Sequence, residues 1–147
     1  MTDSRVAIAS NVADIRRCFP VMRELRIHIT DEQDFVDRIL RQQKEGYQLA
    51  FLEADGELCA VAGYRFLESL FSGKNLYVDD LVTRERDRSR GFGAQLLEWL
   101  ISQARKHRCD TLELDSGVQR FDAHRFYFTQ RMTISSFHFR IKIEPEA

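Results

Sequence analysis

One stretch of the sequence decides the fold: NLYVDDLVTRERDRSRGFGAQLLEWLISQARKH, residues 75–107. Its start, Asn75–Thr83, is rich in the apolar and β-branched residues that predict a buried strand. Its end, Gly91–His107, predicts a helix about 25 Å long at about 1.5 Å per residue. A further short strand is expected at Thr111–Asp115. A strand, a long helix and a strand in succession form a crossover unit, so we expect the two strands to be parallel.

The rest of the chain predicts further helices and strands around this unit. The expected elements are a strand Arg5–Ala9, a helix from Ser10-Asn11 to about Arg26, a helix from Thr30 or Asp31 to near Gly46, strands Tyr47–Glu53 and Leu58–Phe66, a short helix Phe121–Phe128 and a closing strand Thr133–Ile143. An Asp-Gly pair at Asp55-Gly56 is typical of a tight hairpin. Together these elements predict an α/β (α+β) fold, with a mixed, largely antiparallel central sheet of about six to seven strands and helices on both faces.

The length and composition fit one compact domain. The chain has 147 residues, of which 44% are hydrophobic, and only 2 Pro and 7 Gly, which excludes the disordered, collagen-like and linker-rich classes. We therefore expect a single domain over residues 1–147. Its 22 basic and 23 acidic side chains give a formal net charge of -1, which disfavours nucleic acids and membrane surfaces as partners.

Cysteine and histidine give no sign of a disulfide framework or a metal site. The cysteines are odd in number without C-x-x-C spacing, and the histidines have no ligand spacing. These residues are Cys18, Cys59, Cys109, His28, His107, His124 and His138. We expect reduced thiols, no bound metal and a cytoplasmic location. The N-terminal residues MTDSRVAIAS lack the plan of a signal peptide, and no apolar run approaches the roughly 20 residues that span a bilayer.

The loop Thr83–Ala94 joins the central strand to the long helix and predicts an anion site. It holds four Arg and two Gly against Glu85 and Asp87, so we expect a local excess of positive charge. Backbone N–H groups at a helix start lack intrahelical partners, the helix dipole is positive there, and Gly lets a ligand approach closely. The loop is neither a P-loop nor a dinucleotide fingerprint. Taken alone, it is equally compatible with a solvated charged loop.

The pattern Arg88-x-x-Gly91-x-Gly93 resembles the acetyl-CoA-binding signature of the GNAT superfamily of N-acetyltransferases. Two further pieces, Leu81-Val82-Thr83 and Ala123-His124-Arg125-Phe126-Tyr127, resemble the family's pantetheine-pairing strand end and its later A-x-x-F-Y helix. The similarity covers roughly Leu76 to Phe139. It implies a GNAT-like fold and acetyl-CoA as cosubstrate. The residues that it assigns to the cofactor are Leu81, Val82, Thr83, Arg88, Ser89, Arg90, Gly91, Phe92, Gly93 and Ala94, and Arg120 is a further candidate for a cofactor contact.

Two positions depart from the family pattern. The family often has Asn seven residues before the helix Tyr, in contact with the cofactor, where this chain has Arg120. It also often has Gly-Phe after the helix, where this chain has Arg131-Met132. Arg120 can reach a cofactor phosphate or an anionic group of the acceptor, but a surface salt bridge is the favoured role for a single arginine of this kind.

Tyr127 is the candidate acid. A thioester-to-amine transfer releases a thiolate whose conjugate acid has a pKa of about 8.5, and a phenol with a pKa of about 10 is protonated at neutral pH and able to donate. A core aromatic residue is the alternative interpretation. The resemblance of its surroundings to the A-x-x-F-Y helix favours the acid.

Asp79 and Asp80 are the candidate groups for the acceptor amine. They lie in an otherwise apolar strand, and we expect adjacent strand residues to point to opposite faces. Burying carboxylates is costly unless they have a role, and an alkyl amine with a pKa of about 10.4 must lose a proton before it attacks a carbonyl. The run Tyr77–Leu81 resembles the acidic strand of polyamine-type family members. We place Asp79 first as base and Asp80 second; pairing with a nearby Arg is the alternative.

These features predict an N-acetyltransferase that moves acetyl from acetyl-CoA directly to the primary amine of a small molecule. No activated Ser or Cys is evident, and backbone N–H groups near Leu81 and Val82 can polarise the thioester carbonyl. The alternative is a non-catalytic acyl-CoA-binding sensor or interaction module on the same fold. The acceptor stays open between a polyamine-like amine, an aminoalkyl acid or phosphonate and a peptide, as does a homodimer through Ile134–Ile143.

Overall fold

The structure is a computed structural model that describes residues 3–146. The chain groups into two compact units, the first ending at Leu114 and the second beginning at Asp115. The first unit holds a five-stranded sheet and three α-helices, and the second holds one α-helix and the C-terminal segment.

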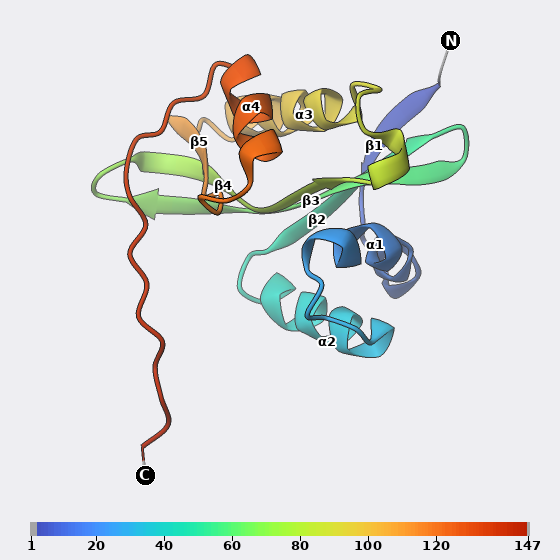
Figure 1. The fold of residues 1–147 in the computed structure, drawn as a ribbon, viewed down its shortest axis with the longest axis horizontal. Helices are drawn as coiled ribbons and strands as arrows, with labels where there is room; N and C mark the ends of the chain where they lie inside the picture. The colour runs from blue at the N-terminus through green and yellow to red at the C-terminus, as the bar shows by residue number, and fades with distance from the viewer. Residues whose placement is uncertain (1–2, 147) are drawn as a thin grey trace. The chain divides into compact units, whose positions relative to one another are not determined.

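The sheet of the first unit has the order β1-β2-β3-β4-β5 (Figure 1). Its strands are β1 Ser4–Ile8, β2 Gln48–Ala54, β3 Glu57–Ser69, β4 Gly73–Thr83 and β5 Thr111–Leu114. The first four strands pair antiparallel, and β4 pairs with β5 in parallel. The hairpin between β2 and β3 turns at Asp55 and Gly56, which both have positive φ, as a tight hairpin turn requires. The mixed, largely antiparallel sheet, the hairpin and the parallel crossover are thus confirmed.

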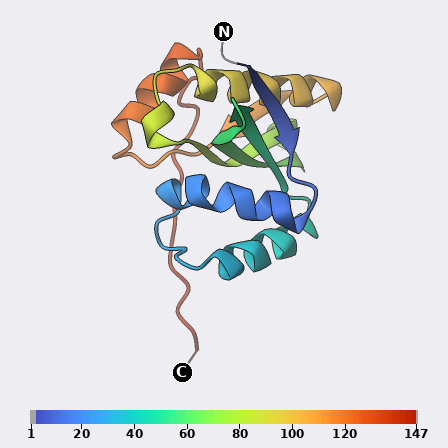
Figure 2. The same cartoon turned by 90° about the vertical axis from the view of Figure 1, so that its right-hand side faces the viewer.

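Helices cover both faces of this sheet, as predicted. Figure 2 shows α1 and α2 on one face and α3 on the other. Their bounds are α1 Val12–Leu25, α2 Glu32–Gln43 and α3 Phe92–Lys106. Side chains cap the first two helices, because Asn11 accepts a hydrogen bond from the Asp14 amide and Asp31 from the Asp34 amide.

The main core lies between the sheet and the two N-terminal helices. Its buried members come from both helices and from the strands β2, β3 and β4, and they include Ile15, Phe35, Leu49, Phe51 and Val61. Burying one such side chain contributes about 1.5–3 kcal/mol to folding. The central strands β3 and β4 are therefore held firmly on this side, which is where the candidate site lies.

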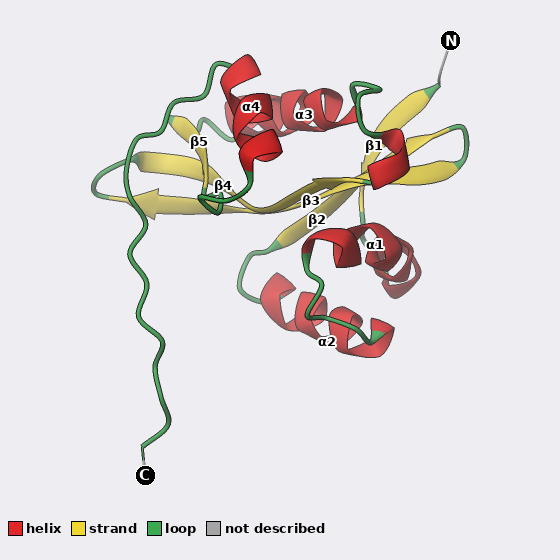
Figure 3. Ribbon diagram, viewed as in Figure 1, coloured by secondary structure: helices red, strands yellow, loops and turns green. Residues whose placement is uncertain are grey.

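The second unit contains α4, Phe121–Thr129, and an extended segment after it. The predicted closing strand Thr133–Ile143 is wrong: residues 133–146 form neither helix nor strand, and Figure 3 draws them as loop. The described residues hence form five strands, not six to seven. Alternating side chains make a segment competent to pair, but a strand exists only where a neighbouring backbone pairs with it. Arg131 has a φ of +65°, the left-handed conformation that glycine adopts most easily.

The helices of residues 3–146 are all too short or too polar to cross a membrane.

Candidate active site

A β-bulge in β4 shapes the candidate site. The register pairs Gly63 with Asp80 and Tyr64 with Val78, which leaves Asp79 opposite no residue of β3. An extra residue cancels one step of the strand's alternation. Asp79 and Asp80 therefore line the same cavity, of about 330 Å³, and the prediction that they point to opposite faces is wrong.

Asp80 is held by two donors, one for each carboxylate oxygen. Arg26, just after α1, donates from Nε to Oδ1 over 2.8 Å, and the Tyr47 hydroxyl donates to Oδ2 over 2.8 Å. Arg26 also donates to the backbone carbonyl of Asp79 over 2.8 Å. Burial and the neighbouring Asp80 carboxylate raise the pKa of Tyr47 well above its ordinary value, so this phenol stays a donor. Asp80 thus links β4 to the residue that follows α1 and to the residue that precedes β2.

Asp79 keeps one oxygen open. Arg65 Nε donates to its Oδ2 over 2.9 Å, and Oδ1 has no donor among residues 3–146. Burial raises the pKa of Asp79 above the ordinary value for aspartate, and the hydrogen bond from Arg65 opposes this rise only in part. Arg65 is itself fixed, since it donates to Gln42 over 3.2 Å and lies over the Tyr47 ring. A carboxylate with a raised pKa and a free oxygen is suited to accept a proton.

The cavity carries charges of both signs. Besides the two aspartates it is lined by the basic groups Arg26, His28 and Arg38, with Phe35 among its apolar walls. These residues come from the end of α1, the loop that follows it, and α2. The cavity can therefore receive a small polar molecule.

Gly63 makes the contact between Tyr47 and Asp80 possible. A Cβ atom at this position would lie 1.8 Å from the Tyr47 hydroxyl oxygen and 2.6 Å from Asp80 Oδ2. Real Cβ atoms do not come this close to other heavy atoms, so any larger residue would push the pair apart. Glycine at this point of β3 is what lets the two side chains meet.

We expect Gly63→Ala to lower the free energy of unfolding by about 1–3 kcal/mol, because the added methyl displaces Tyr47 from a buried site. Urea denaturation followed by circular dichroism measures the loss. Tyr47→Phe is the matched comparison, since it removes the hydroxyl and keeps the ring, and it should cost less. An alanine variant as stable as the native chain would contradict the close contact.

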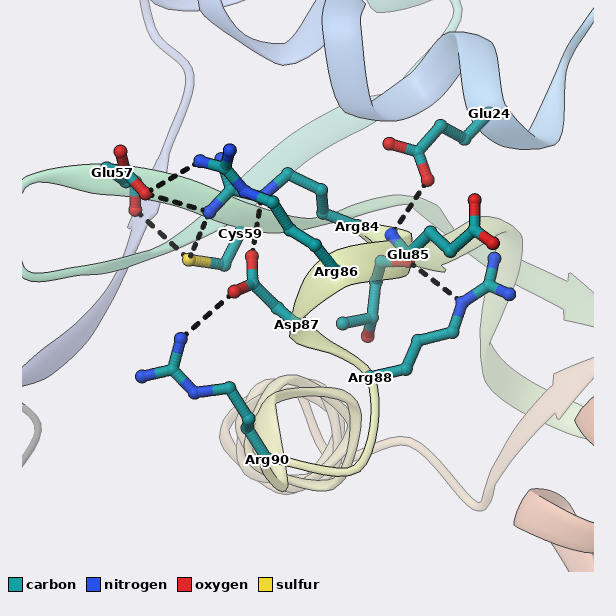
Figure 4. Close-up of polar contacts among 10 residues, drawn as sticks. Glu24, Glu57, Cys59, Arg84, Glu85, Arg86, Asp87, Arg88 and Arg90 are labelled. Carbon is teal, nitrogen blue, oxygen red and sulfur yellow. Dashed lines mark hydrogen bonds and ion pairs between the residues drawn. The ribbon is translucent and has the colours of Figure 1, made fainter.

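The arginines of the loop before α3 are largely paired with acids. Figure 4 shows Arg84 and Arg86 turned toward Glu57, and Arg90 toward Asp87. Arg84 also donates to Asp87, over 2.5 Å, and Asp87 is only 3% exposed. Glu57, from the hairpin, was not counted in the predicted local charge, so the excess of positive charge is smaller than expected. Asp87 organises the loop.

The backbone of this loop is open where α3 begins. A short 3-10 helix, η1 Glu85–Asp87, leads to Ser89 and Gly91, which both have positive φ. Gly91 caps α3 with no side-chain hydrogen bond, so the first amides of the helix lack an acceptor among residues 3–146. Free amides and the helix dipole together favour an anion here.

The same edge of β4 is open beside this loop. β5 pairs with β4 only over Asn75–Val78, so no strand among residues 3–146 pairs with Leu81–Thr83 on that side. An extended ligand can hydrogen-bond to such an edge. The predicted cofactor residues of the strand end and the loop are therefore brought together in the first unit.

In the second unit, Tyr127 lies on α4 and is half-buried. Burial raises the pKa of Tyr127 above its ordinary value, and the nearby positive charge of Arg120 opposes the shift in part. The phenol is therefore protonated at neutral pH, as a general acid requires.

Comparison with known proteins places this chain in a family. A model of the Acetyltransferase (GNAT) family matches residues 10–131. The chain belongs to the GNAT acetyltransferase family. Its predicted resemblance to that family is thus confirmed, and with it the α/β GNAT-like architecture.

Two curated GNAT-type relatives and one solved structure are similar to this chain. An uncharacterized N-acetyltransferase of Bacillus subtilis, YhdJ, is 39% identical over 125 residues, covering 83% of this chain and 87% of that protein. An aminoalkylphosphonate N-acetyltransferase of Salmonella typhimurium is 36% identical over 62 residues, 42% of this chain and 40% of that protein. The structure of a ribosomal-protein-alanine N-acetyltransferase from Brucella melitensis has a TM-score of 0.82 at 15% identity, covering 97% of this chain and 100% of that one. This last likeness concerns the fold alone.

Sequence reasoning missed several residues of the candidate site of this GNAT protein: Arg26, Tyr47, Gly63 and Arg65. A lone Gly in an apolar strand is a signal of a bulge or a close approach, so Gly63 could have been found. The two aspartates of a buried strand also required positive partners. Nothing in the sequence distinguishes Arg26 from the many other arginines as one of those partners. Among residues 3–146, no group of His, Cys, Asp and Glu forms a metal site.

Proposed function

We propose that this GNAT protein transfers acetyl from acetyl-CoA directly to the primary amine of a small molecule. The observation that carries the proposal is Asp79: a half-buried carboxylate with a raised pKa and one free oxygen, facing a cavity of about 330 Å³. Such a group accepts a proton from an amine that enters the cavity. The family assignment supports acetyl transfer as the reaction.

The residues of the loop and the strand end fit the cofactor. The backbone amides over Arg88–Ala94 would hold the pyrophosphate, and the open edge at Leu81–Thr83 would pair with the pantetheine arm. Arg84, Arg86 and Arg90 form ion pairs with acidic residues, so we assign the binding of the anion to the backbone amides. The arginines hold the loop in its conformation through these ion pairs. Acetyl-CoA, when bound, supplies an activated thioester. Arg120 stays proposed as a further phosphate contact.

Each proton has an assigned place in the proposed reaction. Asp79 takes a proton from the ammonium group, directly or through water, so that the nitrogen can attack. The new C–N bond forms as the C–S bond breaks, and backbone N–H groups near Leu81 and Val82 polarise the carbonyl. Tyr127 donates its proton to the departing sulfur, and the second proton that the nitrogen loses as the amide forms restores the Tyr127 hydroxyl, directly or through water. Asp80, with both oxygens engaged, holds the site in shape and is not the base.

The acceptor we propose is a small amine that carries an anionic group. Arg26 and Arg38 line the cavity together with Asp79, which suits a molecule with charges of both signs. The name of the Salmonella relative, an aminoalkylphosphonate N-acetyltransferase, supports an acceptor of this kind.

We propose that the two units act as one catalytic domain, because the family match covers residues 10–131 and so extends from the first unit into the second. We also propose a cytoplasmic location. Cys18, Cys59 and Cys109 are all free thiols, which suits a reducing compartment.

Gly91→Ala is expected to raise the dissociation constant for CoA about 10-fold, because alanine at a φ of +85° strains the anion loop by about 1–2 kcal/mol. Gly46→Ala is a matched control: Gly46 also has positive φ, and at both positions a Cβ would meet nothing within 4 Å. The control should lose similar stability and keep its CoA affinity. Isothermal titration calorimetry measures the affinities. Equal CoA binding by both variants would contradict the site.

The proposed function is tested by mixing the protein with acetyl-CoA, a panel of small amines and a thiol reagent. The proposal predicts that free CoA appears only when a suitable amine is present. A non-catalytic sensor would instead bind acetyl-CoA and release no CoA with any amine, and that result would contradict the proposal.

A further inference from the structure

Arg38 of α2 lines the cavity and forms no ion pair with either aspartate there. Asp80 is paired with Arg26 over 2.8 Å, and Asp79 is paired with Arg65 over 2.9 Å. Each of the two carboxylates therefore already has a guanidinium partner. The charge of Arg38 is thus not needed to balance either of them.

The one acidic partner of Arg38 among residues 3–114 is Asp34, one helical turn earlier. Arg38 Nε donates to Asp34 Oδ2 over 3.0 Å. Pairs of this spacing on a helix surface are weak, and a guanidinium carries five N–H donors, more than one carboxylate can engage. Asp34 is not among the residues that line the cavity, whereas Arg38 is. Asp34 therefore orients Arg38, whose remaining donors are available to an anion in the cavity.

One face of α2 connects Arg38 to the candidate base. The residues of α2 that line the cavity recur at the spacing of a single helical face: Phe35, Arg38, Ile39 and Gln42. Gln42 is one turn after Arg38, about 6 Å further along the helix axis at about 1.5 Å per residue. Its side-chain oxygen accepts a hydrogen bond from Arg65 over 3.2 Å, and Arg65 in turn holds Asp79. A short molecule in the cavity can therefore contact Arg38 at one end and Asp79 at the other.

We propose that Arg38 binds the anionic group of the acceptor while the amine lies at Asp79, so that this residue selects short amines with a phosphonate or carboxylate group over polyamines. The inference rests on the proposed transfer to an amine. A guanidinium binds such oxyanions through paired, charge-assisted hydrogen bonds. A polyamine would instead bring a second ammonium group toward Arg38, and both aspartates already have arginine partners. Repulsion between like charges then disfavours the polyamine.

Steady-state kinetics of two matched variants, Arg38→Gln and Arg41→Gln, test this assignment. Arg41 lies on the same helix but is not among the residues that line the cavity. With aminoethylphosphonate as acceptor, Arg38→Gln should raise KM about 10–100-fold and leave kcat largely unchanged, because hydrogen bonds between charged groups are lost from binding. With ethanolamine, which has no anionic group, KM should not change. The Arg41 variant should match the native chain with both acceptors.

The native chain provides a test of the selection itself. Its kcat/KM should be higher for aminoethylphosphonate than for spermidine, and Arg38→Gln should reduce this preference. A native preference for spermidine would overturn the proposal. So would an unchanged KM for aminoethylphosphonate in the Arg38 variant.

A binding measurement separates this inference from the proposed function. Phosphorus NMR follows the titration of aminoethylphosphonate with the protein saturated with CoA, so that no acetyl transfer occurs. Arg38→Gln should weaken binding at least about 10-fold, whereas Arg41→Gln should bind as the native chain does. Equal binding by the two variants, or no binding by the native chain, would overturn the role of Arg38. The proposed function fails on a different result, the absence of CoA release with every amine.

Discussion

Replacing Tyr127 by phenylalanine is expected to lower kcat by about 10²–10⁴-fold and to leave the affinity for acetyl-CoA unchanged. The phenol is half-buried, and burial raises its pKa, so its proton is available at neutral pH. Phenylalanine keeps the ring and its packing but removes the only proton that the residue can donate. The thiolate would then leave unprotonated, which slows the chemical step and not the binding step.

Tyr64→Phe is the matched control for this prediction. Tyr64 is also a buried tyrosine: its side chain is 2% exposed and packs edge-on against Phe66 and Trp99. Removal of the Tyr64 hydroxyl in this control variant should leave kcat unchanged. Steady-state kinetics give kcat, and calorimetry with CoA gives the affinity. Unchanged turnover in the Tyr127 variant would remove this residue from the mechanism.

Asp79→Asn is expected to lower kcat/KM for the amine by about 10²–10⁴-fold at neutral pH, because the amide cannot accept the ammonium proton. The pH profile gives a second readout. Burial raises the pKa of Asp79, so activity should fall as the pH drops through a value above that of an ordinary aspartate. The base works only when ionised, and its loss should remove this acidic limb.

The neighbouring carboxylate gives the control. Asp80→Asn weakens the contacts with Arg26 and Tyr47, so it should lower the free energy of unfolding by about 1–3 kcal/mol and retain the acidic limb. Kinetics over a range of pH with both variants decide between the two aspartates. An acidic limb that persists in the Asp79 variant and disappears in the Asp80 variant would reverse the assignment.

The parts of the fold that could be predicted are those that depend on residues close together in the sequence. The hairpin at Asp55-Gly56, the helix starts at Ser10-Asn11 and at Thr30 or Asp31, and the strand–helix–strand crossover each depend on residues close in sequence, and all were found. The closing strand depended on a partner backbone, which the alternation of residues 133–143 does not specify. Its prediction therefore failed, although the pattern itself was real.

The candidate site shows the same limit. The sequence places Asp79 and Asp80 on a central strand. A single extra residue in this strand, opposite Gly63 and Tyr64, lets both aspartates line the same cavity. That bulge depends on pairing between two strands, as does the choice of Arg65 as the partner of Asp79. The charge of the loop before α3 also depended on a distant residue, Glu57. Long-range partners of this kind leave no pattern in one sequence.

The most direct test of the central claim follows a labelled acetyl group by mass spectrometry, using isotopically labelled acetyl-CoA and a panel of small amines with and without an anionic group. Direct transfer predicts that the label appears on the amine nitrogen, that free CoA forms in equal amount, and that the protein stays unlabelled. Labelled protein would contradict direct transfer. Acetyl-CoA that stays intact with every amine would contradict the proposed enzyme itself.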